Sequence, residues 1–168
     1  MAIKDALLPE FDHEMGTTRR VLERVPDEKF GWKPHPKSMS MGDLAIHLAD
    51  MAHWTDAIMN QTEFDVATAP PSDAAARPKT RAAMLDRFDA ATRAARAILA
   101  AKTDAEYLAN WTLKSKGQTV FSMPRAATLR SFVMNHNIHH RGQLSVYLRL
   151  NDIAVPSIYG PSADEGQM

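Results

Sequence analysis

Three histidines lie close together near the C-terminal end of the chain, in a stretch whose apolar pattern predicts a helix. His136, His139 and His140 fall within five positions, although the 168 residues contain only seven histidines. Imidazole is the commonest protein ligand for transition metals, and two histidines four residues apart on one helix can bind the same ion. A further histidine, His47, lies in a second helical pattern far upstream. These four residues are the candidates for metal chemistry.

Helical geometry indicates which of these histidines face the protein interior. At 100° per residue, with His136 set to zero, His140 lies at about 40°, within the apolar stripe of its helix. His139 lies at about −60°, at the edge of that stripe. The same count places His47 within the apolar stripe of the upstream helix. We therefore predict that His47, His136 and His140 point inward and that His139 lies at the margin or on the surface.

The spacing alone leaves two interpretations of these histidines open. Each could be an ordinary buried histidine with one hydrogen bond, since histidine is intermediate in burial. Burying three unpaired imidazoles is costly, and a shared metal ion removes that cost. The convergence of three rings therefore favours a metal site without establishing one.

Residues next to the histidines have candidate supporting roles. The free ring nitrogen of a metal-binding histidine needs an acceptor, and Asp43, Asp50 and the carbonyl of Gln143 are candidates. For both aspartates a role as surface charges is the favoured interpretation. Arg141 is expected in a surface salt bridge, and Gly142 is expected where a helix or the tail approaches closely. The tryptophans are interpreted as core residues, with pocket lining as the alternative: Trp32, Trp54 and Trp111.

Four stretches show the apolar spacing of amphipathic helices. The predicted helices span residues 3–25, 40–59, 80–102 and 124–150, and Ser38 or Ser40 is the predicted N-cap of the second. A short hairpin is expected at Lys116–Gly117, whereas the proline-containing residues 61–79 and 151–168 are predicted to be irregular. The predicted fold is all-α: a single four-helix bundle domain over residues 1–168, with long crossover connections between non-adjacent helices.

Composition limits the class of protein. Twenty basic residues balance twenty acidic ones, which gives no general attraction to nucleic acid or to anionic membranes. The chain contains no cysteine, so disulfides, thiolate metal ligands and a cysteine nucleophile are excluded. No apolar run reaches the ~18–20 residues that span a bilayer, and the N-terminus lacks the apolar stretch of a signal peptide. We expect a cytoplasmic protein that binds neither nucleic acid nor membrane.

Three segments of the sequence resemble the DinB-like superfamily of metal-binding four-helix bundles. The first is HNIHHRGQL at residues 136–144, which is similar to the C-terminal signature of this DNA-damage-inducible family. The second is WKPHPKS at 32–38 followed by LAIHL at 44–48, and the third is the tail VPSIYGPSADE at 155–165. The resemblance covers nearly the whole chain.

The resemblance implies a divalent metal held by one histidine on the second helix and an HxxxH pair on the last. These positions are His47, His136 and His140, the residues that the helical angles select independently. Three neutral histidines leave at least one coordination position open, as in catalytic sites, and zinc and nickel both suit imidazole. The resemblance also suggests a homodimer and places Tyr159 near a pocket mouth.

Three functions are consistent with such a site. The first is an enzyme that acts on a small molecule, of the type that transfers groups to or from a low-molecular-weight thiol, as the resemblance implies. The second is metal-dependent hydrolysis, and the third is a metal-binding stress-response protein without turnover. The spacing of the ligands does not separate them, and the sequence identifies no general base.

Overall fold

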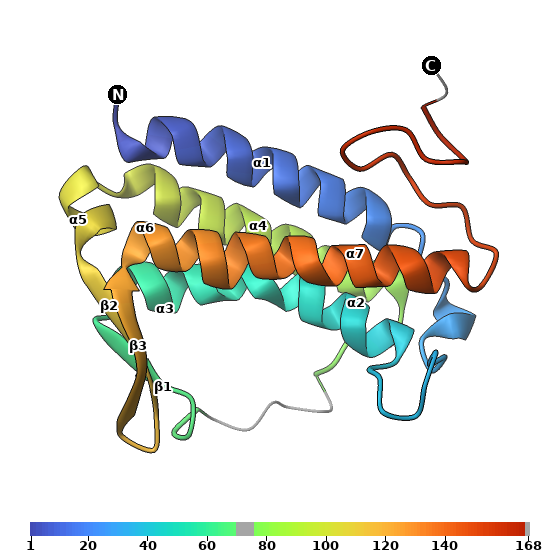
Figure 1. Ribbon diagram of the computed structural model, residues 1–168, viewed down its shortest axis with the longest axis horizontal. Helices are drawn as coiled ribbons and strands as arrows, with labels where there is room; N and C mark the ends of the chain where they lie inside the picture. The colour runs from blue at the N-terminus through green and yellow to red at the C-terminus, as the bar shows by residue number, and fades with distance from the viewer. Residues whose placement is uncertain (70–75, 167–168) are drawn as a thin grey trace.

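Four long helical segments lie side by side in the computed structural model of the chain, and a small sheet projects from one end (Figure 1). The structure describes residues 1–69 and 76–166. The long segments are α1 (Ile3–Leu22); α2 (Met41–Asp50) with η2 (Met51–His53) and α3 (Trp54–Asn60); α4 (Arg81–Ala101); and α6 (Arg125–Thr128) with η3 (Leu129–Asn135) and α7 (His136–Arg149). The short elements are η1 (Asp27–Lys29), β1 (Glu63–Asp65), α5 (Asp104–Leu108), β2 (Asn110–Ser115) and β3 (Gln118–Pro124). Three of the four ranges predicted to be helical contain one of the long segments, and the second segment exceeds its predicted range 40–59 by one residue, Asn60.

The chain order of the long segments differs from their order in space. Helix α1 packs on α4 and α7, and α2 packs on the same two helices. Helices α1 and α2 are therefore at opposite corners, as are α4 and α7. Helices α1 and α7 run in one direction, whereas α2 and α4 run in the other (Figure 1). The prediction of crossovers between non-adjacent helices is confirmed.

Side-chain caps set where several helices begin. Ser40 accepts a hydrogen bond from the backbone N–H of Asp43 at 3.0 Å, and the Asp43 carboxylate accepts one from Ser40 N at 3.4 Å. This reciprocal arrangement satisfies two of the free N–H groups at the start of α2. Thr80 caps α4 with a single hydrogen bond, accepting from Ala83 N at 3.2 Å. Of the two candidate N-caps, Ser40 is the one used, and it fixes the start of the helix that carries His47.

The prediction of an all-α fold is wrong in one respect, because the structure contains a three-stranded mixed sheet. Strand β2 is antiparallel to β3, and β1 is parallel to β2 on its other side. The hairpin at Lys116–Gly117 was predicted, but β1 falls within the range 61–79 that was predicted to be irregular. Its three residues are too few to show a strand period. Residues 70–75 of that range lie outside the described residues.

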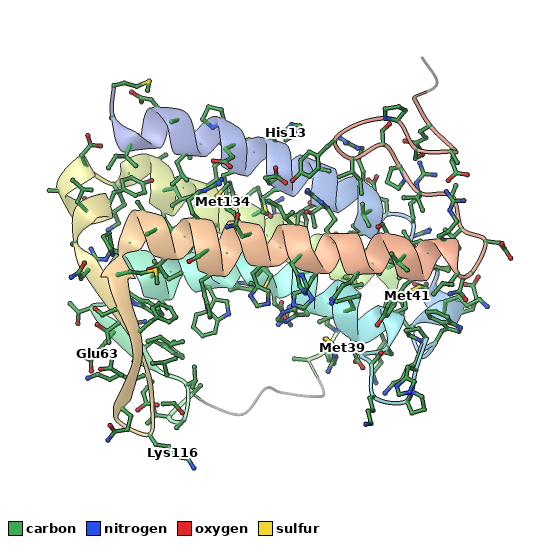
Figure 2. All side chains as sticks on the ribbon, in the orientation of Figure 1. His13, Met39, Met41, Glu63, Lys116 and Met134 are labelled. Carbon is green, nitrogen blue, oxygen red and sulfur yellow. The ribbon has the colours of Figure 1, made fainter. Side chains whose placement is uncertain are left out.

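Asp65 at the end of β1 holds this strand to the hairpin turn. Lys116 and Gly117 both have positive φ, 52° and 76°, as a two-residue hairpin turn requires. Their backbone N–H groups donate to the Asp65 carboxylate at 3.0 and 2.6 Å. The hydrogen bond from Gly117, followed by that from Ala67, lowers the pKa of Asp65. Figure 2 shows Lys116 at the tip of the hairpin and Glu63 on β1.

The two helical segments that carry the candidate histidines both depart from α geometry. A 3₁₀ turn, η2, separates α2 from α3 and begins four residues after His47. The π-helical segment η3 immediately precedes His136. A π turn contains more residues than an α turn, so the angle per residue changes there. The count at 100° per residue is consequently valid from His136 onward but not before it.

Apolar side chains from all four long segments fill the interior. Trp111 and Tyr107 extend this core toward the sheet, and the Tyr107 hydroxyl donates to the carbonyl of Leu99 at 2.8 Å. Within the described ranges 1–69 and 76–166, no helix combines the length and the apolar character needed to cross a bilayer. The largest fully buried apolar side chains are Trp111, Tyr107, Phe11, Phe88, Met15, Leu22, Met41, Leu44, Leu48, Met51 and Ile58.

Two helical glycines should respond to alanine in opposite directions. Gly16 is exposed in the middle of α1, and a Cβ there meets no atom within 4 Å. Gly16→Ala should raise the free energy of unfolding by about 0.5–1 kcal/mol, because glycine is a poor helix former. Gly42→Ala should lower it, because the new Cβ would lie 2.9 Å from the Cβ and ring of Phe30. Urea unfolding of both variants checks this, and equal shifts of the same sign would contradict it.

Candidate metal centre

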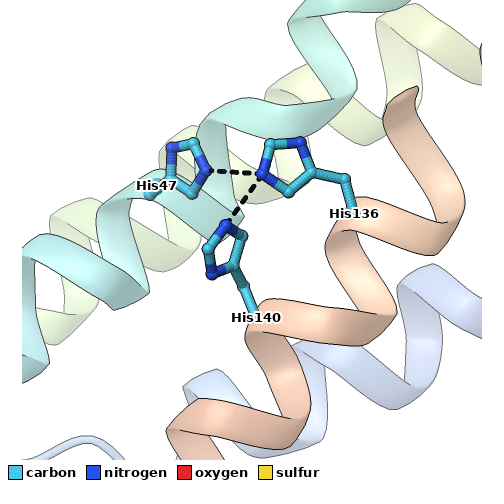
Figure 3. A group of neighbouring side chains, drawn as sticks. All are labelled: His47, His136 and His140. Carbon is cyan, nitrogen blue, oxygen red and sulfur yellow. Dashed lines mark hydrogen bonds between the residues drawn. The ribbon is translucent and has the colours of Figure 1, made fainter. Parts of the chain in front are cut away.

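Three imidazole rings meet where α2 packs on α7 (Figure 3). His47 comes from α2, whereas His136 and His140 are one turn apart at the start of α7. Nε2 of His136 lies 3.4 Å from Nε2 of His47 and 2.8 Å from Nε2 of His140. One nitrogen from each ring lies within 4.8 Å of the other two. Nitrogen ligands ~2.0–2.1 Å from a tetrahedral ion are about 3.3 Å apart, so the three residues could hold one metal ion.

The outer ring nitrogen of His140 has a protein partner that suits metal binding. Nδ1 of His140 lies 2.7 Å from Oε1 of Gln143. With its proton on Nδ1 for this contact, His140 presents the lone pair of Nε2 toward His136, whose Nε2 lies 2.8 Å away. Holding the outer nitrogen in this way leaves Nε2 free to bind a metal ion.

The local environment favours the neutral form of two of the three rings, His47 and His136. Burial, followed by the proximity of His140 and His136, lowers the pKa of His47 to about 4. Burial, followed by the proximity of His140, also lowers the pKa of His136. Metals bind the neutral imidazole. Neither His47 nor His136 therefore has to lose a proton to bind an ion at neutral pH.

The pKa of His47 gives a prediction for the protein without metal. In the unfolded chain this imidazole takes up a proton near its ordinary pKa of 6.5, but in the fold it does so only near 4. The unfolded state binds more protons between these values, so the free energy of unfolding should fall as the pH is lowered from 6.5 to 4. Urea unfolding at a series of pH values should show a smaller fall for His47→Gln. His53→Gln is the control, because the His53 side chain is 55% exposed. An unchanged pH profile in His47→Gln would contradict the prediction.

The structure places the other candidate residues as follows. Gln143 contacts His140 as predicted. Asp43 instead caps α2 and pairs with Arg77 at 2.6 Å, and Asp50 forms an ion pair with Arg87. Neither aspartate is the acceptor that the sequence suggested. Both carboxylates instead bind arginines from outside their own helix.

The helical angles separate His139 from the other two histidines of α7, as predicted. The buried stripe of this helix, however, does not lie where the angles placed it. His139 is exposed, whereas His136 and His140 are partly buried. The fully buried face of α7 lies one residue further along and contains Asn137, Arg141, Leu144 and Leu148. The histidines therefore lie beside the core, with one side toward solvent, where an exogenous molecule could reach a bound ion.

Arg141 was predicted on the surface, and this prediction is wrong. Its side chain is 1% exposed and forms an ion pair with Glu14 of α1 at 2.8 Å. The Tyr159 hydroxyl, from the tail, lies 2.8 Å from the same carboxylate and 2.6 Å from the guanidinium. Tyr159 thus joins the tail to this buried pair. Glu14 falls on the apolar face of α1, between Phe11 and Thr18, and this placement was the available signal in the sequence.

Gly142 was predicted to lie where a helix or the tail approaches closely, and this is also wrong. The residue is exposed, and a Cβ there meets no atom within 4 Å. Trp111 is a fully buried core residue, as interpreted, whereas Trp32 and Trp54 are only partly buried at the edge of the core.

The protein is a small set of packed helices, and three histidines converge where α2 packs on α7. These two features define a class of small helical proteins that could bind a metal ion. The DinB family profile matches residues 1–167. The chain therefore belongs to the DinB family, as its sequence motifs suggested.

Several known proteins are similar to this chain. The uncharacterized protein YrdA of Bacillus subtilis (strain 168) is 25% identical over 161 residues, covering 96% of this chain and 90% of YrdA. The crystal structure of a DinB-like protein from Bacillus cereus ATCC 10987 superposes with a TM-score of 0.72 at 22% identity, covering 94% of this chain and 98% of that one. The DinB-like protein YjoA from Bacillus subtilis gives a TM-score of 0.67 at 20% identity, covering 90% and 95%. These two structures share the fold.

Proposed function

We propose that this DinB-family protein binds a divalent transition metal, zinc or nickel, through His47, His136 and His140. The observation that carries the proposal is the convergence of three Nε2 atoms, one of them on a ring whose outer nitrogen contacts Gln143. Imidazole suits both metals. Three protein ligands leave a coordination position for an exogenous molecule, as in catalytic rather than structural sites.

We further propose that the protein is an enzyme that transfers a group to or from a low-molecular-weight thiol. A divalent ion at this site would act as a Lewis acid and favour the thiolate form of a thiol bound to it. The chain contributes ligand orientation through Gln143, and the packing of α2 on α7 shields one side of the site from water. Thiol activation of this kind needs no separate base. This favours it over hydrolysis, since the carboxylates nearest to His47 in the sequence, Asp43 and Asp50, are already paired with arginines.

The test combines metal analysis with a substrate panel. Protein loaded with zinc or nickel is assayed with thiols and electrophiles in pairs, and separately with esters and amides. Thiol-dependent turnover that is lost in His140→Ala supports the proposal. Ester or amide cleavage without a thiol would establish the hydrolase alternative. Stoichiometric metal with no turnover in any arm would indicate a non-catalytic metal-binding protein.

We also propose that the protein forms a homodimer through its tail and one face of α7. Val146 on α7 and Leu150 at the C-cap of this helix are four residues apart and are 56% and 60% exposed. Gly142 lies one turn before them and leaves room for a second chain to approach. Sedimentation at micromolar concentration should show a dimer for the native chain and a monomer for Val146→Glu. A native chain that sediments only as a monomer would contradict this.

A further inference from the structure

Four partly buried aromatic side chains form a continuous group beside the histidines. The Phe132 ring lies 6.0 Å from the ring of His136, centroid to centroid, and 5.1 Å from Trp54. Phe64 continues the group at 5.1 Å from Trp54, and Phe121 lies 6.0 Å from Phe132. These residues pack against the core without being fully covered. We refer to Trp54, Phe64, Phe121 and Phe132 as the aromatic wall.

Both helix irregularities described above lie next to this wall. Trp54 is the first residue after the 3₁₀ turn η2, and Phe132 is in the centre of the π segment η3. Their rings meet nearly perpendicularly, at 89°. Departures from α geometry of this kind are frequent at functional sites. Here they occur on the two helical segments that supply the histidines and bring an aromatic pair to the edge of the cluster.

Three carboxylates that are close to Trp54 or Phe64 in the sequence have partners in the protein. Glu63 and Lys114 pair with each other at 2.6 Å, and the Asp65 carboxylate accepts backbone N–H groups. Asp56, two residues after Trp54, accepts a hydrogen bond from the side chain of Asn60 at 2.8 Å. The wall itself consists of aromatic rings packed on the apolar core, and such a surface suits an uncharged group.

We propose that the aromatic wall receives an uncharged aromatic group of the small molecule that binds at the metal. The inference rests on the proposed function, because it places the reactive end of that molecule on the ion held by His47, His136 and His140. Aromatic rings favour edge-to-face contacts with other aromatic rings, and Phe132 directly adjoins the ligand His136. The wall thus assigns a substrate class to the site: small molecules that carry an aryl group next to the metal-binding atom.

The test measures thiol binding to the cobalt-loaded protein. Phenylmethanethiol and ethanethiol carry the same CH₂–SH group and differ in a phenyl or a methyl substituent. The absorption of a cobalt–thiolate bond reports binding of each one. The native chain should bind phenylmethanethiol about tenfold more tightly or better, because its ring is buried against the wall. Trp54→Leu and Phe132→Leu should reduce that preference by roughly three- to tenfold, the range expected for an aromatic pair.

Trp32→Leu is the matched control. Trp32 is also a partly buried tryptophan in an edge-to-face contact, 5.5 Å from Tyr147, but it is not part of the wall. This variant should keep the native preference, and cobalt uptake by each variant shows that its site is intact. Equal affinities of the native chain for the two thiols, or equal losses of the preference in Trp32→Leu and Trp54→Leu, would overturn the inference about the aromatic wall while leaving the proposed function standing.

A native chain that takes up no cobalt would overturn the proposed function and the inference with it. Loss of a dimer in Trp54→Leu would show that the wall is covered by a second chain and would also overturn the inference.

Discussion

Replacing His136 or His140 with alanine should abolish stoichiometric metal binding, whereas His139→Ala should retain most of the affinity. His136 and His140 present Nε2 atoms 2.8 Å apart, toward the ring of His47. Removing one of them leaves two histidines and water, which form a much weaker site. The exposed His139 ring lies beside His140, with its centroid 5.0 Å away, but it is not among the residues that converge. Metal content after dialysis, measured for each purified variant, checks the prediction.

Gln143 provides a graded comparison in the same experiment. Its Oε1 atom orients His140 without belonging to the converging set. Loss of such an outer partner typically costs about 10–100-fold in metal affinity. Gln143→Ala should therefore weaken binding by this amount, and the loss of a ligand should exceed it. Loss of the ion in His139→Ala with retention in His140→Ala would show that the ligand assignment is wrong.

Arg141→Ala should lower the free energy of unfolding by about 3–5 kcal/mol, the cost of leaving a buried charge without its partner. The Arg141 and Glu14 side chains are 1% and 7% exposed. The arginine also donates to the carbonyl of Glu14 at 3.1 Å and to Thr18 Oγ1 at 3.3 Å. Without it, the Glu14 carboxylate is left with the Tyr159 hydroxyl as its remaining partner in this network. Urea unfolding of the metal-free protein measures the effect.

Two further variants separate the charge from the rest of the network. Tyr159→Phe removes one hydroxyl and should cost about 1–3 kcal/mol, because a buried carboxylate loses one of its hydrogen bonds. Glu14→Gln combined with Arg141→Met removes both charges and should recover much of the stability lost in Arg141→Ala. A loss below 1 kcal/mol in Arg141→Ala would show that the ion pair contributes no more than an exposed one.

The sequence allowed the histidine cluster to be predicted because the ligands depend on short-range geometry. His136 and His140 lie within one regular helix, so their relative angle followed from helix parameters alone. Gln143 was found for the same reason. The placement of His47 opposite them depended on the pairing of α2 with α7, which the family resemblance supplied and the angles did not.

The remaining features depend on contacts between distant parts of the chain. Arg141 and Glu14 are 127 positions apart, and neither residue type is expected in a core unless its partner is known. Strand β1 exists because β2 offers it a free edge, and three residues carry no pattern of their own. The π segment has no sequence signal that we identified. Its effect explains why the stripe on the last helix was misplaced although the histidines were correctly grouped.

The π segment also makes chain length between the sheet and the histidines critical. It joins α6, which continues directly from β3, to α7, which begins with His136. Removing one residue from this junction would turn α7 by about 100° relative to the sheet. Asn137 would then take the place of His136 around the helix axis, and Arg141 would take the place of His140. The junction therefore tolerates changes of residue type far better than changes of length. We expect that a relative with one residue more or fewer at this junction has lost either the histidine cluster or the buried ion pair.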